Sequence, residues 1–130
     1  MLEPVEIIAN YYKALYSGDL ASAKVLMTEE SYIMTLETFG LRVALKDQAF
    51  KARLKEIGDD PAALAEVEKR LSFDLVSRER SPVIMIVSAS PNGENRQTVE
   101  YTEDGKNKKL YFSKEEDGWK IDYYAGRKVD

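Results

Sequence analysis

The fold is decided by residues 92–121, which read NGENRQTVEYTEDGKNKKLYFSKEEDGWKI. Three dipeptides, Asn92-Gly93, Asp104-Gly105 and Asp117-Gly118, divide stretches in which apolar and polar residues alternate. A period of two is typical of half-buried strands, and Asn-Gly and Asp-Gly favour the tight turns that join antiparallel strands. With the apolar segment 83–89 before it, this stretch predicts an antiparallel meander of four strands.

A fifth strand is an alternative, because Phe73 and Leu75 alternate with polar residues and the Ser81-Pro82 step ends or kinks that segment. On this interpretation Asp74 and Arg78 flank the apolar positions of the strand and face outward. The sheet would then begin directly after Leu71.

The turns also predict which residues face each other across the strands. A two-residue turn at Asp104-Gly105 gives three chemically sensible pairs: Val99 with Leu110, Gln97 with Phe112, and Glu100 with Lys109. The other two turns, treated in the same way, give three more: Phe112 with Tyr123, Tyr111 with Tyr124, and Ile86 with Val99. Loops two residues longer leave the faces unchanged.

This register sorts the side chains onto two faces of the sheet. The face that we expect against the helices is nearly free of charge and holds Ile84, Ile86, Val99, Tyr101, Leu110, Phe112, Ile121 and Tyr123, with Trp119 near a turn. The opposite face has an apolar centre of Val83, Met85, Val87, Tyr111 and Tyr124, rimmed by Glu100, Lys109, Lys120 and Asp122. A solvent-exposed apolar patch of this kind usually marks an interface between proteins. We therefore expect a two-fold homodimer through Met85, Val87, Tyr111 and Tyr124.

The amino-terminal half reads as helical. A first helix is predicted over 3–17, and Gly18 and Asp19 end it and cap a second helix over 20–27. Residues 28–40 fit both helical and strand periods, and the helical one is favoured. A further helix is predicted over 41–57, and Asp60-Pro61 begins the next one.

Composition limits the function. A length of 130 residues fits one domain, and a net charge of −4 argues against a nucleic-acid partner. The chain has no cysteine and no histidine, so disulfides, thiolate chemistry and an imidazole acid or base are excluded. We expect no metal site and no cofactor. Neither a signal peptide nor an apolar run long enough for a membrane span is present, and a cytoplasmic protein is the default.

Two segments resemble a known superfamily. The helical hairpin Ala14-Leu15-Tyr16-Ser17-Gly18-Asp19-Leu20 and the terminal hairpin Asp117-Gly118-Trp119-Lys120-Ile121 are similar to those of nuclear-transport-factor-2-like proteins, which include SnoaL-like and ketosteroid-isomerase-type members. The resemblance implies an α+β fold, a cystatin-like cone in which a curved sheet wraps the first helix. It also implies a pocket at the wide end and, in many members, a dimer through the sheet. Residues 28–71 show little resemblance to the superfamily.

The resemblance assigns candidate roles to particular residues. In the isomerase branch a tyrosine donates to an oxyanion and a carboxylate is the base. Tyr11 matches the tyrosine by its spacing to Gly18, but the base position falls at Thr35, and Glu37 is the nearest acid. Tyr11 and Glu37 are therefore weak catalytic candidates. The expected pocket between helix and sheet is lined by Tyr12, Tyr16, Phe50, Tyr101, Phe112, Trp119 and Tyr123.

Three functions follow from these residues, in order of preference. The first is a non-catalytic binder of a small apolar or aromatic molecule. The second is a dimeric protein-interaction module, and the third is an isomerase-like or hydratase-like enzyme that uses tyrosine and carboxylate groups.

Overall fold

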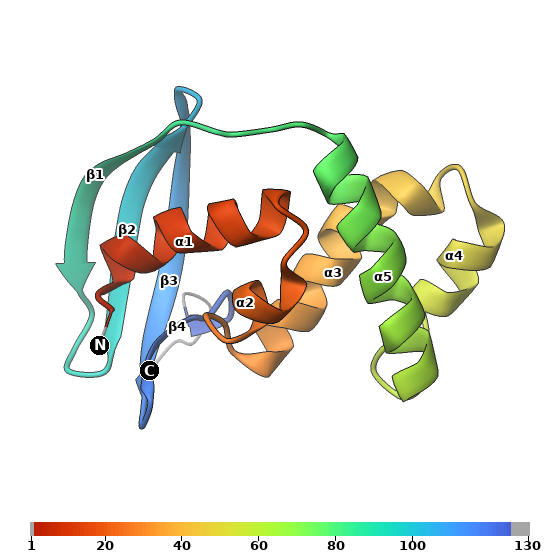
Figure 1. The fold of residues 1–130 in the computed structure, drawn as a ribbon. Helices are drawn as coiled ribbons and strands as arrows, with labels where there is room; N and C mark the ends of the chain where they lie inside the picture. Colours follow the sequence, from red (N-terminus) through yellow and green to blue (C-terminus); the bar gives the residue numbers. More distant parts are fainter. Residues whose placement is uncertain (1, 126–130) are drawn as a thin grey trace.

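The computed structural model describes residues 2–125 and has an α+β fold, in which five helices precede a four-stranded antiparallel sheet (Figure 1). The helices are α1 (Pro4–Tyr16), α2 (Leu20–Lys24), α3 (Glu29–Ala44), α4 (Gln48–Leu54) and α5 (Pro61–Ser77). The strands are β1 (Ile84–Pro91), β2 (Arg96–Glu103), β3 (Lys106–Glu115) and β4 (Gly118–Ile121), and they lie in the sheet in the order of the sequence.

Side-chain caps explain where four of the helices begin. Asp19, Thr28, Asp47 and Asp60 each accept a hydrogen bond from a backbone amide in the first turn of α2, α3, α4 and α5, respectively. The helical interpretation of residues 28–40 is thereby confirmed. The single helix predicted over 41–57 is wrong, because α3 ends at Ala44 and Asp47 begins a new helix.

The predicted strand over Phe73 and Leu75 is also wrong, since both residues belong to α5. The buried residues Val67, Leu71 and Leu75 recur every fourth position, and this helical period outweighs a brief alternation. Asp74 and Arg78 accordingly form an ion pair one helical turn apart, with nitrogen and oxygen 2.8 Å from each other.

The register across Asp104-Gly105 is confirmed: Val99 pairs with Leu110, Gln97 with Phe112, and Glu100 with Lys109. The pairs predicted at the other two turns are shifted by two residues. The loop between β3 and β4 is not centred on its dipeptide, and between β1 and β2 an offset of three at the turn becomes two beyond a bulge in β1. Phe112 pairs with Ile121 rather than Tyr123, Tyr111 accepts from the amide of Asp122 rather than facing Tyr124, and Ile86 pairs with Tyr101 rather than Val99.

Because a shift of two preserves the alternation of side chains, the inner face of β2, β3 and β4 is as predicted. Its residues Val99, Tyr101, Leu110, Phe112 and Ile121 are all buried. On the edge strand β1, Ile84 is half-buried and Ile86 is exposed, and Trp119 and Tyr123 are half-buried at the other end of the sheet. The register also breaks between Ile86 and Ser88, where a bulge leaves Val87 unpaired.

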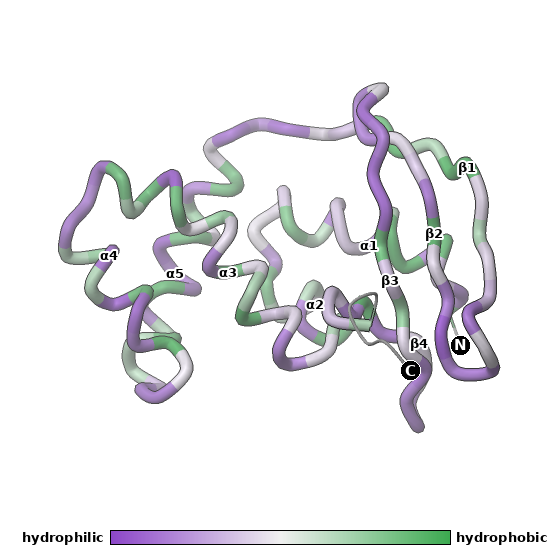
Figure 2. Tube along the Cα trace, turned by 180° about the vertical axis from the view of Figure 1, so that it is seen from behind, coloured by the Kyte–Doolittle hydropathy of each residue, from purple (hydrophilic) through white to green (hydrophobic). Residues whose placement is uncertain are grey.

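Helix α1 lies across the inner face, whereas α3, α4 and α5 lie beside the sheet (Figure 1). Residues 26–28 run along the free edge of β4, where Met27 pairs in parallel with Ile121. The opposite view shows the hydrophobic start of β1 at the other edge of the sheet (Figure 2). None of the helices within residues 2–125 is long and apolar enough to cross a membrane.

Candidate functional site

Tyrosine hydroxyls meet in the layer between α1 and the sheet. The Tyr12 hydroxyl on α1 lies 2.7 Å from that of Tyr101 on β2, and the Tyr11 hydroxyl lies 3.2 Å from that of Tyr123 after β4. The rings of Tyr11 and Tyr12 meet edge to face, with centroids 5.2 Å apart. Thr35 of α3 completes the group, with its hydroxyl 3.5 Å from that of Tyr123.

Burial makes three of these tyrosines weaker acids than usual. Desolvation raises the pKa of Tyr11 and Tyr12 well above the ordinary value, and it raises the pKa of Tyr101 to about 12. Tyr11, Tyr12 and Tyr101 are therefore held in the neutral form, in which a hydroxyl donates and accepts hydrogen bonds.

The two catalytic candidates lie apart. Tyr11 is buried between α1 and the sheet, whereas Glu37 is exposed on α3. Thr35, at the position that the resemblance assigns to the base, is buried next to Tyr123 and has a hydroxyl where a carboxylate is required. Within residues 2–125 no cluster of three acidic side chains offers a metal site either.

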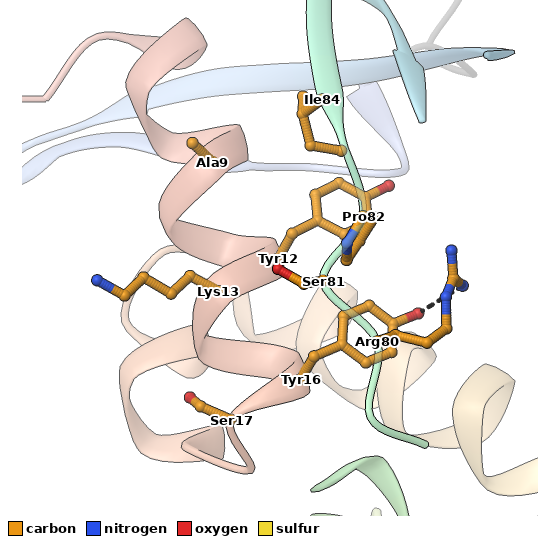
Figure 3. A pocket seen from close by; sticks show the side chains of 9 residues that line it. All are labelled: Ala9, Tyr12, Lys13, Tyr16, Ser17, Arg80, Ser81, Pro82 and Ile84. Carbon is orange, nitrogen blue, oxygen red and sulfur yellow. Dashed lines mark hydrogen bonds between the residues drawn. The ribbon is translucent and has the colours of Figure 1, made fainter. Parts of the chain in front are cut away.

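A groove opens beside Tyr12, one of these tyrosines. It has a volume of about 530 Å³ and lies between α1 and residues 80–84, a segment we call the strap, which connects α5 to β1 (Figure 3). Its lining residues are Ala9, Tyr12, Lys13, Tyr16 and Ser17 from α1 and its end, and Arg80, Ser81, Pro82 and Ile84 from the strap. In Figure 3 the rings of Tyr12 and Tyr16 point from the helix toward the strap.

Arg80 holds the strap in place. Its guanidinium donates to Glu103 at 3.1 Å and to Asp104 at 2.8 Å, both at the end of the β2 hairpin. It also donates to the Tyr16 hydroxyl at 3.2 Å and stacks over the Tyr16 ring. The amide of Val83 and the guanidinium of Arg80 both donate to the Asp104 carboxylate, which lowers the pKa of that acid. One wall of the groove is therefore fastened to the sheet and to α1.

The seven predicted pocket residues lie in four places. Tyr12 and Tyr16 line the groove, and Tyr101, Phe112 and Tyr123 lie in or against the core between α1 and the sheet. Trp119 is half-buried on β4 beside Lys114. Phe50 belongs to α4, packs near Gly40 of α3 within the hydrophobic core, and is not among the lining residues of the groove.

Sequence reasoning missed the strap. Ser81-Pro82 was interpreted as the end of a strand, and Arg80 was given no role. The signal was present in Pro82, because a proline between a helix and a strand indicates an extended connection that can lie along another element.

The predicted dimer face is exposed at β1. Val83, Met85 and Val87 have 63, 64 and 63% of their surface exposed, whereas Tyr111 and Tyr124 are half-buried. Across the middle of this face, Glu100 and Lys109 form an ion pair at 3.6 Å. Asp122, predicted for the rim, is instead buried and accepts from Ser113.

Comparison of the chain with protein-family models, with curated proteins and with solved structures finds no match.

Proposed function

We propose that this protein binds a small apolar or aromatic molecule in the groove between α1 and the strap. The observation that carries the proposal is the pairing of two tyrosine rings on α1 with Pro82 and Ile84 on the strap around a space of about 530 Å³. Ligand sites are typically concave, of this order of volume, and lined by aromatic and apolar side chains with a few polar groups.

The groove is also held open before any ligand arrives. Arg80 ties the strap to Glu103, Asp104 and Tyr16, and the Tyr12 hydroxyl is bonded to Tyr101 below. A wall that is already ordered costs little entropy when a ligand binds. Non-catalytic binding is favoured over an enzyme, because Tyr11 is buried between α1 and the sheet whereas Glu37, the nearest acid to the base position, is exposed on α3.

Filling the groove tests the proposal directly. Ala9 is exposed on α1 and lines the groove, so Ala9→Trp would fill it without removing a buried contact. Ala65→Trp, at an exposed position in the middle of α5, is the matched control. Native mass spectrometry of the freshly purified protein should detect a co-purified small molecule on the wild type and on Ala65→Trp, but not on Ala9→Trp. Equal occupancy in all three proteins would contradict the proposal.

A second candidate function, a homodimeric interaction module, is favoured by one observation. Val83, directly before β1, and Met85 and Val87 on β1 expose their side chains, while the nearby charges Glu100 and Lys109 neutralise each other. Such a face can meet its own copy without like charges opposing each other.

Membership in the nuclear-transport-factor-2-like superfamily, with its cone-shaped fold, is a proposal as well. It is supported by the order of the elements, with helices before an antiparallel meander, and by the position of α1 across the inner face of the sheet. The separate helices α4 and α5 fall in the region of the sequence that resembles the superfamily least.

A further inference from the structure

The charged residues that line the groove are all basic. Lys13 and Arg80 are among its lining residues and no acid is, although the whole chain has a net charge of −4. The two cations differ in their surroundings. Arg80 is neutralised by Glu103 and Asp104, whereas Lys13 forms no ion pair with any residue in the described part of the chain.

Lys13 borders the groove on the α1 side. It follows Tyr12 directly and precedes Tyr16 by three residues, so its long aliphatic stem starts beside both rings. Figure 3 shows its ammonium group extending from α1 on the side away from Arg80. The side chain is exposed, and a change of rotamer about its long aliphatic stem would bring the ammonium to a molecule bound in the groove.

We infer that the molecule bound in the groove carries an anionic group, a carboxylate or a sulfonate, that pairs with Lys13 while its apolar body lies on Tyr12 and Tyr16. The inference rests on the proposed function and adds the class of ligand. An exposed ion pair contributes little energy, so the negative charge should improve affinity by a small factor, about three- to fivefold. The contacts with the aromatic rings supply the rest of the binding free energy.

Two dyes with the same ring system separate charge from shape. Anilinonaphthalene sulfonate is the anionic probe and N-phenylnaphthylamine is its neutral counterpart, and both fluoresce when they enter an apolar site. The titrations use Phe73→Ser as the background, because a second apolar groove on α5 contains Phe73, which is 74% exposed. In this background the sulfonate should bind about three- to fivefold more tightly than the amine.

Variants of Lys13 test whether its ammonium group causes the preference for the sulfonate over the amine. Lys13→Gln should abolish the preference for the sulfonate and leave the affinity for the amine unchanged, whereas Lys13→Arg should keep the preference. Lys55→Gln, an exposed lysine after α4, is the control for net charge and should also keep it. Added salt should weaken sulfonate binding alone.

The outcomes distinguish the inference of an anionic ligand from the proposal that the groove binds a small molecule. Equal affinity for both dyes, or a preference that survives Lys13→Gln, would overturn the anionic ligand while the groove remains a binding site. Binding of neither dye, or binding that Ala9→Trp leaves unchanged, would overturn the proposed function and this inference with it.

Discussion

The hydroxyl of Tyr12 on α1 lies 2.7 Å from the hydroxyl of Tyr101 on β2, and this contact joins the helix that lines the groove to the sheet beneath it. Both rings are almost fully buried, and they meet at 66° with centroids 6.1 Å apart. The floor of the groove is therefore part of the core of the protein.

Removing either hydroxyl should destabilise the protein. Tyr12→Phe and Tyr101→Phe should each lower the free energy of unfolding by about 1–2 kcal/mol, because the remaining hydroxyl loses a buried partner. The double variant should lose less than the sum of the two, by about 0.5–1.5 kcal/mol. Urea denaturation of the four proteins measures this coupling. Strict additivity would show that the two hydroxyls do not stabilise each other.

Stability should fall in alkaline solution. The folded protein raises the pKa of Tyr101 to about 12, while the unfolded chain titrates near 10, so the folded state holds the proton more tightly. The contribution is fully present below pH 10 and is lost as the pH rises from about 10 toward 12, at about 1.4 kcal/mol per pH unit. Urea denaturation between pH 8 and 11 checks the slope, which Tyr101→Phe should reduce. An identical slope in that variant would contradict the assignment.

Gly18 should tolerate no side chain. Its φ is +75°, and a Cβ there would lie 2.7 Å from Val76 Cγ2 and 2.8 Å from Ser72 Oγ of α5. Gly93 has a φ of +101° but nothing within 4 Å of the same position, so it is the matched control for backbone strain alone. Gly18→Ala should cost about 1–3 kcal/mol more than Gly93→Ala in thermal or urea unfolding. Equal losses of stability in the two variants would mean that α5 moves aside at no energetic cost when a side chain is added at position 18.

The end of α5 should accept a stabilising change. Glu79 is exposed and adopts a φ of 50°, a left-handed conformation that costs a non-glycine residue energy. Glu79→Gly should raise the free energy of unfolding by about 0.5–1 kcal/mol. A lower melting temperature in this variant would contradict the expectation and would point to a stabilising role for the Glu79 side chain.

The dimer face gives a prediction of its own. Met85→Glu combined with Tyr111→Glu should convert a dimer into a monomer, because each copy would bring new negative charges to the centre of the face. Light scattering measures the change in mass. Lys51→Glu with Lys55→Glu, on α4 away from the sheet, should leave the mass unchanged. A wild type that is already monomeric at high concentration would remove the interaction-module candidate.

Much of the sheet was predictable because local chemistry determines it. At Asp104-Gly105 both residues have positive φ and form the turn itself, so the pairing of Val99 with Leu110 followed from counting. The turn before β4 consists of Glu116 and Asp117, and Gly118 is already the first residue of the strand, which shifted the predicted register by two. An Asn-Gly or Asp-Gly dipeptide indicates that a turn is present more reliably than it indicates which two residues lie at the centre of that turn.

The site was less predictable, because it depends on contacts between distant segments. Tyr12 and Tyr16 were identified from their helical spacing, which places them on one side of α1. The strap was not, since the ion pairs of Arg80 with Glu103 and Asp104 join residues 23 and 24 positions apart. Phe50 lies near Gly40 on a neighbouring helix and outside the lining of the groove, and nothing in its own segment indicates this packing.

Amide chemical-shift mapping with N-phenylnaphthylamine reports where a small aromatic molecule lies on this protein without assuming a function. We expect shifts that are concentrated in residues 9–17 and 80–84 and absent from Ala9→Trp. Shifts confined to residues 66–76 of α5, or no shifts at saturating dye, would contradict this expectation.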